Sequence, residues 1–416
     1  MSKLKFVPGE TYVPVSGKVF GQEEIDNAIE AARDGWWTEG RWAKKFESEF
    51  KKFLGVEYVT LVNSGSSANL NALAALTSPV FGDRQLKPGD EYITCAVGFP
   101  TTVNPGIQHG LTPVFVDADL TTLNIDVEKI EAAISPKTKL IMVAHTLGIP
   151  YNINKIKELA KKYQLWIIED CCDALGSTHN GQLVGTFGDI ATYSFYPAHQ
   201  ITMGEGGAVV TNNPLIHRCL RQFRDWGRDC YCDTGKDNTC GRRFKWKLGE
   251  LPYGYDHKYI YSMIGYNLKL TDFGPAIGIA QLRRLPDFIK RRRANYATLR
   301  KFFVQYPILF KIIEEPAGTK PCWFGFPIIV QKEAPFSRND VTEYLEAHKV
   351  GTRNIFSGNL LRHPAYLRVE NKRVMGEMTN ADIVMNQAFW LGVFPGIGAP
   401  QMKYVLKTLS EFVRQY

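Results

Sequence analysis

Short apolar runs alternate with amphipathic stretches between residues 58 and 168. The amphipathic stretches Asp126–Ile134 and Asn152–Tyr163 have the spacing of helices, with Asn124 or Asp126 and Asn152 as candidate N-caps. Alternation of this kind predicts an α/β domain with a mostly parallel sheet, whose ligands bind at the carboxyl ends of the strands. The apolar runs of strand length are Tyr58–Val62, Glu91–Cys95, Pro113–Val116, Leu140–Ala144 and Leu165–Ile168.

The pattern changes near Leu285. A long basic helix is expected over residues 286–306, followed by the apolar run Phe324–Val330 and then by alternating short elements. We therefore expect two domains. Residues 1–284 would form an N-terminal segment and a large α/β domain that includes a cysteine-containing loop at 228–242, and residues 285–416 would form a small C-terminal α+β domain.

Composition places the chain among soluble globular proteins, with 416 residues, 44% hydrophobic and 22% charged. The net charge of +8 comes from scattered Lys and Arg, and the densest run is Lys290–Arg293. That run is interpreted as a solvated helix face, with a docking surface for an acidic partner or for nucleotide phosphates as the alternative. No recognised motif accompanies the charge, so nucleic-acid binding is not expected.

Targeting signals are not expected in this sequence. Met1–Thr11 contains no apolar run of about seven residues that could serve a signal peptide, and no later run approaches the roughly eighteen residues of a membrane span. A cytoplasmic protein without membrane contact is the resulting expectation. The eight cysteines are too few for a disulfide scaffold, and in a reducing compartment a cysteine cluster more often binds metal or takes part in catalysis.

The residues that are candidates for binding or catalysis lie just after the predicted strands. The turn Asn63–Asn69 opens onto a helix, so its N–H groups and hydroxyls could bind a phosphate, although a plain N-cap is the alternative. Phe99 places an aromatic ring after the next strand, where a core position is the alternative. Asp170 ends an apolar strand, and a buried acid there needs a partner such as a pyridinium nitrogen, with an N-cap role as the alternative.

Taken in this order, the segments resemble the DegT/StrS family of sugar aminotransferases and their dehydratase relatives. The resemblance covers nearly the whole chain, and it implies the fold of pyridoxal phosphate (PLP)-dependent transferases of fold type I, which is aspartate aminotransferase-like. The large domain would then bind the coenzyme. The motifs that carry the resemblance are Trp37–Gly40, the SGSSAN turn at 64–69, Gly98–Pro100, the ED-x-x-x-ALG segment at 169–176, the SFYP segment at 194–197 and Gly265–Asn267.

Residue by residue, the family implies a coenzyme site. Asp170 would bind the ring nitrogen, Phe99 would stack on the pyridine ring, and Ser194 would be a further phosphate or coenzyme contact. The remaining coenzyme contacts implied for the phosphate are Gly65, Ser66 and Ser67.

One position departs from the family's aminotransferases, which carry a lysine that bonds covalently to the coenzyme. Here the residue is His199, and the nearest lysines, at 161, 162 and 236, lie in other contexts. Imidazole is a competent base near neutral pH but forms no stable imine, so the coenzyme would be held noncovalently, as pyridoxamine 5'-phosphate or PLP. The chain is therefore not expected to be an aminotransferase.

The same substitution characterises the family's sugar 3-dehydratases, which remove the C3 hydroxyl of nucleotide-linked 4-keto-6-deoxyhexoses. By this resemblance, His199 would take a proton from the benzylic carbon of the coenzyme and would protonate the leaving hydroxyl. Asp173 and Tyr196 would complete the catalytic set by hydrogen bonding to coenzyme or substrate, although either could instead support local backbone.

Four cysteines have the spacing C-x57-C-x-C-x7-C: Cys172, Cys230, Cys232 and Cys240. Four thiolates can hold an iron-sulfur cluster or tetrahedral zinc, and chance proximity is the alternative. The spacing resembles that of the iron-sulfur 3-dehydrases of the ascarylose and 3,6-dideoxyhexose pathways, which implies a 2Fe-2S cluster. Cys171 is a rival for the first ligand, and the cysteines at 95, 219 and 322 are expected to be buried thiols.

The leading hypothesis is thus a 3-dehydrase that uses pyridoxamine phosphate and a 2Fe-2S cluster on CDP-4-keto-6-deoxy-D-glucose, with an NADH-dependent reductase as electron donor. An iron-free 3-dehydratase of a GDP- or dTDP-linked sugar is the second, and a noncatalytic protein derived from an aminotransferase is the third. The resemblance also implies a homodimer and nucleotide-sugar contacts at Arg353, Asn359 and Arg362.

Overall fold

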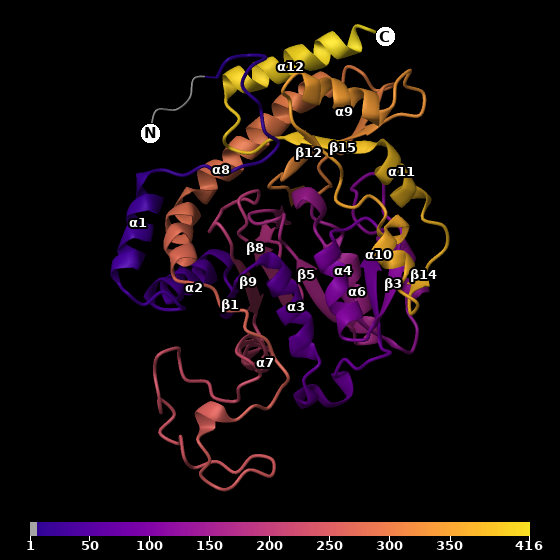
Figure 1. Ribbon diagram of the computed structural model, residues 1–416. Helices are drawn as coiled ribbons and strands as arrows, with labels where there is room; N and C mark the ends of the chain where they lie inside the picture. The colour runs from indigo at the N-terminus through magenta and orange to yellow at the C-terminus, as the bar shows by residue number, and fades with distance from the viewer. Residues whose placement is uncertain (1–5) are drawn as a thin grey trace.

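The computed structural model describes residues 6–416, and its centre is an eight-stranded sheet in the order β1-β9-β8-β5-β4-β2-β3-β14 (Figure 1). Strand β9 is antiparallel to both neighbours, and the other strands run in one direction. The sheet is therefore mixed but mostly parallel, as predicted. Its strands are β1 (Tyr58–Val62), β2 (Glu91–Cys95), β3 (Thr112–Val116), β4 (Thr138–Ala144), β5 (Trp166–Asp170), β8 (Ile190–Ser194), β9 (Gly207–Thr211) and β14 (Arg373–Val374).

Burial explains why these segments form central strands. Every residue of β2, β5, β8 and β9 is buried, which is typical of strands whose two faces are both covered. The predicted bounds of β1 and β2 are confirmed, and those of β3, β4 and β5 differ by at most two residues. Continuous apolar runs are a strong signal because both side-chain faces of such a strand must leave water.

Helices that join the strands begin where the sequence supplies caps. Helix α3 (Gly65–Leu76) follows β1, and the Ser64 hydroxyl accepts a hydrogen bond from the Ser67 N–H at 3.1 Å. Helix α6 (Ile153–Tyr163) follows the predicted cap Asn152. The helix expected at 126–134 is a 3-10 turn, η2 (Val127–Lys129), and one short helix, α5 (Ile130–Ala133), after the predicted cap Asp126. The remaining helices that pack on the sheet are α4 (Pro100–Gln108) and α7 (Pro214–Arg224).

Helix α8 (Phe273–Phe303) is the longest helix, with 31 residues, and it runs past α1 (Gln22–Arg33) and α2 (Arg41–Leu54) (Figure 1). The expected start at Pro286 is wrong, because this proline lies inside the helix. Proline removes one hydrogen bond of the helix. Packing against α1 and α2 supports the part of α8 that precedes Pro286. The expected domain division at residue 285 falls within α8 and stays a prediction.

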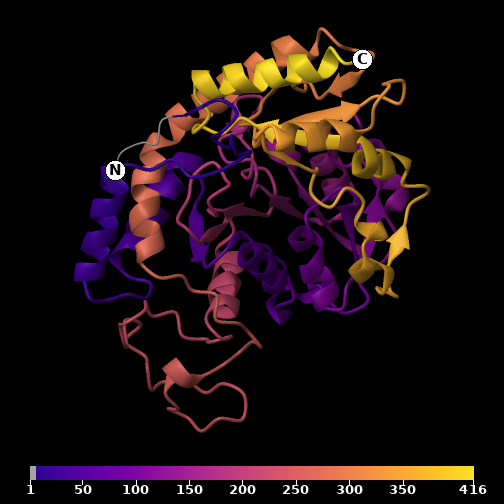
Figure 2. The same ribbon diagram turned by 45° about the horizontal axis from the view of Figure 1, so that its top comes forward.

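A second, four-stranded antiparallel sheet has the order β10-β12-β15-β13, and a small third sheet has the order β11-β6-β7. Helix α12 (Ala399–Val413) crosses the end of the molecule near α8 and α9 (Figures 1 and 2). The other elements of this part are β10 (Phe310–Ile312), β11 (Thr319–Lys320), β12 (Gly325–Val330), β13 (Thr352–Arg353), β15 (Ala388–Gly392), α9 (Arg338–Ala347), α10 (Pro364–Leu367) and α11 (Thr379–Gln387), and the third sheet adds β6 (Thr178–His179) and β7 (Gln182–Leu183).

The segment between α7 and α8 extends away from the sheet as a long irregular loop (Figure 1). A bridge between Arg228 and Tyr261 closes its base, and a 3-10 turn, η4 (His257–Tyr259), lies within it. We call residues 228–261 the cysteine loop, because it carries Cys230, Cys232 and Cys240. Within residues 6–416, no helix is both long and apolar enough to cross a membrane.

Candidate active site at the strand ends

Asp170 is a buried carboxylate at the carboxyl end of β5, with 4% of its surface exposed. One oxygen accepts hydrogen bonds from Asn69 Nδ2 at 2.9 Å and Thr102 Oγ1 at 2.6 Å, and the other accepts from the Cys172 N–H at 3.1 Å. The donors hold the carboxylate in one orientation, but none of these three donors carries a positive charge. A cationic ring nitrogen would supply the partner that a buried carboxylate requires.

The first turn of α3 presents N–H groups beside the end of β8. Gly65 is required there, because a Cβ on this residue would lie 2.4 Å from the Cβ of Ser194. Ser66 is exposed, whereas the Ser67 hydroxyl donates to Asn63 Oδ1 at 2.6 Å. The helix dipole and the free N–H groups of this turn are typical of a phosphate site, with Ser66 more available than Ser67.

Phe99 is the N-cap residue of α4 and is 51% exposed. Its ring centroid lies 6.2 Å from that of Phe356, which comes from the C-terminal part of the chain. The alternative of a core position is therefore wrong for Phe99. An exposed aromatic ring beside a buried acid and a helix N-terminus can cover one face of a planar ligand.

His199 lies beside Asp173, with its Nδ1 atom 3.3 Å from Asp173 Oδ1. The other Asp173 oxygen is buried without a hydrogen-bond partner among the described residues. Burial raises the pKa of Asp173, and the neighbouring His199 opposes that rise. The Phe324 ring packs against the imidazole at a centroid distance of 5.3 Å. Tyr196 is 51% exposed, so its hydroxyl is free to reach a ligand.

The structure brings three of the four predicted metal ligands together. Cys230, Cys232 and Cys240 line one small cavity of the cysteine loop, together with His257. Cys172 lies elsewhere, because its sulfur would be 3.1 Å from a Cβ at Gly65 in the first turn of α3.

Three thiols do not complete a four-thiolate site, so these cysteines as placed do not support a reaction step through a metal centre. Burial and the neighbouring Asp170 raise the pKa of Cys172, which favours its neutral thiol. Cys171 is fully buried, as are the three cysteines that were expected to be buried thiols, Cys95, Cys219 and Cys322.

The segment that carries the implied substrate residues lies beside the Phe99 turn. The Ser357 hydroxyl donates to the Gly98 carbonyl at 2.6 Å. Asn359 is 1% exposed and donates to Asp382 at 2.7 Å, and Arg362 also binds Asp382, at 3.0 and 2.6 Å. Arg353 and Arg362 each have 59% of their side chain exposed, but Arg353 makes no hydrogen bond to Asp382. Direct contact with a substrate stays a prediction for all three.

Asn69 and Thr102 were not singled out from the sequence, although both bind Asp170. The available signal was their position in the first turns of two helices, because Asn69 ends the SGSSAN motif and Thr102 follows Gly98–Pro100 by two residues. Thr192 supports this set, because its hydroxyl donates to Asn69 Oδ1 at 2.6 Å.

The interpretation of Lys290–Arg293 as a solvated helix face is wrong for two of its members. Arg292 is 1% exposed, and Arg293 donates to the carbonyls of Pro321 and Lys320 at 3.0 and 2.9 Å. Lys290 and Arg291 are exposed. The second half of α8 packs against the chain on one side, so a run of consecutive charges cannot all face water.

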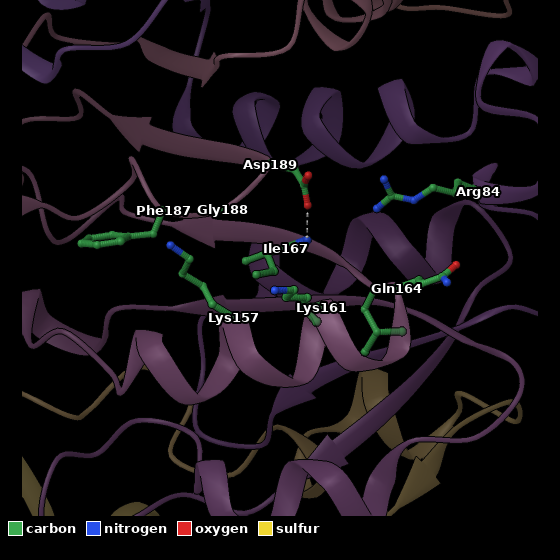
Figure 3. Close-up of a pocket in the computed structure, with 10 residues that line it drawn as sticks. Arg84, Lys157, Lys161, Gln164, Ile167, Phe187, Gly188 and Asp189 are labelled. Atoms are coloured by element: carbon green, nitrogen blue, oxygen red, sulfur yellow. Dashed lines mark hydrogen bonds between the residues drawn. The ribbon is translucent and has the colours of Figure 1, made fainter.

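A hollow of about 440 Å³ lies at the amino end of β5, lined by Arg84, Lys157, Lys161 and Asp189 among others (Figure 3). Asp189 accepts a hydrogen bond from the Ile167 N–H at 2.9 Å (Figure 3). The hollow lies at the end of β5 opposite to Asp170. The hollow is therefore separate from the residues that are predicted to bind the coenzyme.

The residues at the carboxyl ends fit a B6 coenzyme. The buried carboxylate of Asp170 lacks a cationic partner among its hydrogen-bonded neighbours, the first turn of α3 offers free N–H groups, and Phe99 exposes a ring. Those features match the ring nitrogen, the phosphate and the ring face of the coenzyme. The side chain of His199 is an imidazole and not a primary amine, so a coenzyme in this site would have no covalent link through that position.

Comparison with known proteins agrees with this site. The RfbH lipopolysaccharide biosynthesis protein of Salmonella typhimurium is 52% identical over 99% of this chain and 94% of its own length. The dTDP-4-dehydro-2,6-dideoxy-D-glucose 3-dehydratase of Saccharopolyspora spinosa is 48% identical over 98% of this chain and 88% of its own.

The chain is also similar to a solved structure of Escherichia coli GDP-4-keto-6-deoxy-D-mannose-3-dehydratase with bound hydrated PLP, with a TM-score of 0.85 and 30% identity over 96% of this chain and 100% of the other. The architecture is thus the fold type I of PLP-dependent enzymes. A model of one family matches residues 19–410. This chain belongs to the DegT/DnrJ/EryC1/StrS aminotransferase family.

Proposed function

We propose that this chain removes the C3 hydroxyl group of a nucleotide-linked 4-keto-6-deoxyhexose with the help of pyridoxamine 5'-phosphate. The observation that carries the proposal is the pair of His199 and Asp173, 3.3 Å apart, at the position where the resemblance implies the family's lysine. A base that cannot bond covalently to the coenzyme suits elimination better than amino transfer. Relatives named 3-dehydratases, at 48% and 32% identity, support the same reaction class.

When bound, the coenzyme supplies an amine that reacts with the C4 ketone and a ring that accepts electrons. Asp170 would hold the ring nitrogen protonated, and Phe99 would exclude water from one ring face. Gly65, Ser66, Ser67 and Ser194 would bind the phosphate. These residues place the reacting carbon in a fixed position.

His199 would move the protons of the reaction. Asp173 Oδ1 lies 3.3 Å from Nδ1, so a hydrogen on Nδ1 would face this carboxylate and would leave Nε2 to accept a proton. The imidazolium that forms is stabilised by the same carboxylate, and it can then protonate the departing C3 hydroxyl. Tyr196, with its exposed ring, would hydrogen-bond to the coenzyme or the sugar.

The nucleotide is proposed to be GDP or dTDP, since relatives at 48% and 32% identity are named for sugars that carry these groups. Arg353 would contact the nucleotide sugar through its exposed guanidinium. Asn359 and Arg362 would shape the site through Asp382, to which both are bonded.

The second candidate is the same dehydration completed by a 2Fe-2S cluster, with CDP-4-keto-6-deoxy-D-glucose as substrate and an NADH-dependent reductase as electron donor. The observation in its favour is the cavity that Cys230, Cys232 and Cys240 share. Cys172 would have to approach that cavity to complete the ligand set. This candidate ranks second because the fourth thiol lies against the first turn of α3.

Iron analysis separates the two candidates. Protein purified without oxygen should contain about two irons per chain and absorb visible light if the cluster is present. Cys230→Ser and Cys172→Ser should then both lose the iron, whereas Cys219→Ser, which changes a buried thiol elsewhere, should keep it. Protein without iron that still turns over the sugar would eliminate the cluster candidate.

Product analysis tests the main proposal. Purified protein with a stoichiometric amount of pyridoxamine phosphate should convert a GDP-, dTDP- or CDP-linked 4-keto-6-deoxyhexose into a 4-keto sugar with a methylene group at C3, detected by NMR. The coenzyme is the reductant of this conversion, so an equal amount of PLP and of ammonium should be released. An amino sugar as the product would show an aminotransferase instead. Protein that binds neither coenzyme nor sugar would favour the noncatalytic alternative.

A homodimer of this chain is also proposed, from the family resemblance. Light scattering during size-exclusion chromatography should give twice the chain mass of 47.0 kDa. A monomer mass in active protein would remove this part of the proposal.

A further inference from the structure

Arg292 places a guanidinium inside the protein, although it belongs to the most basic run of the sequence. The side chain is 1% exposed, and within residues 6–416 its hydrogen bonds go to three backbone carbonyls and to no carboxylate. A buried charge without an ion partner is costly, because it gives up its hydration. We therefore expect the positive charge or the several N–H donors of the guanidinium to stabilise the groups around it.

The three carbonyls belong to the two backbone segments that flank the imidazole of His199. Arg292 Nη2 donates to the carbonyl of His199 itself at 3.0 Å. Its Nη1 donates to the carbonyls of Trp323 and Phe324 at 3.1 and 3.2 Å. The Phe324 ring is also the aromatic neighbour of the imidazole. One guanidinium thus fixes both the histidine and the ring that packs on it.

Gln200 extends the same network on the other side. Its side-chain amide donates to the carbonyls of Asp173 and Cys322. The backbone of the Asp173 segment is thereby tied to the residue that follows His199. Together, Arg292 and Gln200 determine the relative position of the imidazole and its carboxylate partner.

Few charged groups face the imidazole. Lys18 and Arg292 line the small cavity beside His199, and Asp173 Oδ1 lies 3.3 Å from its Nδ1 atom. Arg292 therefore acts on His199 through backbone carbonyls, whereas Asp173 faces the ring directly.

We infer that Arg292 is a positioning residue for His199, which aligns the imidazole through three backbone carbonyls. The inference rests on the proposed role of His199 as the base. Arg292 lies behind the histidine backbone and is not placed in contact with substrate or coenzyme.

The test uses three variants, two at position 292 and one at the neighbouring position 291. Arg292→Met removes the charge and the donors, Arg292→Lys keeps the charge with fewer directed donors, and Arg291→Met changes an exposed neighbour as the control. Histidine-labelled protein without coenzyme is titrated by NMR, and the His199 signal is assigned as the one absent from His199→Asn. With substrate, kcat and KM are measured across pH.

Arg292→Lys should lower kcat by about tenfold or more, with KM within about twofold, because the imidazole is less well aligned. Arg292→Met should lower kcat at least as far and should move the NMR signal of the His199 ring, because all the donors to the three carbonyls are lost. Arg291→Met should behave like the wild type in both measurements.

An unmoved His199 ring signal and a wild-type kcat in Arg292→Met, with only a lower melting temperature, would overturn the inference and leave a purely structural role. Should Arg292→Met not fold, a wild-type kcat in Arg292→Lys would overturn it equally. The NMR titration needs no sugar, so failure to find a substrate would count against the proposed function and not against the role of Arg292.

Discussion

The imidazole of His199 and the carboxylate of Asp173 form a close pair, 3.3 Å apart between Nδ1 and Oδ1. The pair lies where the family's aminotransferases carry a lysine. It provides a proton acceptor that is oriented by an acid, without an amine that could bond to the coenzyme. Several expected outcomes depend on this relationship and on its surroundings.

Restoring the lysine should restore covalent binding. His199→Lys is expected to turn yellow with PLP, because an amine at this position can form an imine with the coenzyme aldehyde. Borohydride should make the link permanent, which mass spectrometry of the peptide containing residue 199 would detect. The matched control, His199→Asn, should bind PLP but give no reducible adduct. A labelled peptide from the wild type at some other lysine would contradict the account.

Neutralising Asp170 should weaken the coenzyme site. Asp170→Asn keeps the side-chain volume but removes the charge opposite the ring nitrogen, and a charged hydrogen bond contributes about 1.5–3 kcal/mol. We therefore expect coenzyme affinity to fall by roughly 10- to 150-fold, measured by equilibrium dialysis. Affinity unchanged within about twofold would show that the ring nitrogen does not meet this carboxylate.

Much of this site lies on segments whose positions are predictable from sequence. Strands such as β2 and β5 are buried on both faces, so their approximate positions are clear, and Asp170 is the last residue of β5. The pairing of His199 with Asp173 is not predictable in this way, because both lie on irregular turns after different strands.

Tertiary packing decides the features that the sequence did not predict. The start of α8 was missed because contacts with α1 and α2 support a helix that contains Pro286. The burial of Arg292 depends on three carbonyls from distant segments. The separation of Cys172 from the cysteine loop likewise depends on how a long irregular segment folds, which spacing alone does not encode.

Stability should fall with rising pH near neutrality because of Glu47. Burial, with Glu39 nearby, raises the pKa of Glu47 to about 7. The folded state therefore favours the protonated form of Glu47. The stability that this preference contributes is complete below the usual carboxyl pKa and is lost as pH rises through about 7. Glu47→Gln should remove about 2–3 kcal/mol of this pH dependence, measured by urea unfolding at pH 5.5 and pH 8.

The control for Glu47 is Glu57→Gln, an exposed residue in a surface ion pair with Lys51. That variant should keep the wild-type slope of stability against pH. If Glu47→Gln also keeps the slope, Glu47 is not the group that titrates near neutral pH.

The cysteine loop should loosen when Glu39 loses its charge. Glu39 binds the buried Arg224 at 2.6 and 2.8 Å, and its carboxylate also accepts from the Thr234 hydroxyl at 3.0 Å. Glu39→Gln leaves the buried Arg224 with one carboxylate partner, Asp225, at 3.0 and 3.2 Å. The unfolding free energy should therefore fall by about 1.5–3 kcal/mol, the contribution of a charged hydrogen bond, and trypsin should cut the loop at Lys236 faster.

Glu23→Gln is the matched comparison, because Glu23 forms an exposed pair with Arg283 at 2.6 Å. Exposed pairs contribute about 0–1 kcal/mol, so this variant should keep both its stability and its rate of cleavage. Equal effects of the two substitutions would show that the Glu39–Arg224 pair does not anchor the loop.

The central claim is that His199 is the base that replaces the family's lysine. The most direct measurement is exchange of the benzylic hydrogen of bound pyridoxamine phosphate with deuterated solvent during turnover of a nucleotide-linked 4-keto-6-deoxyhexose. His199→Asn should retain the coenzyme but lose both exchange and turnover by about 100-fold or more, because proton transfer has lost its base. Exchange and turnover at the wild-type rate in His199→Asn would contradict the account.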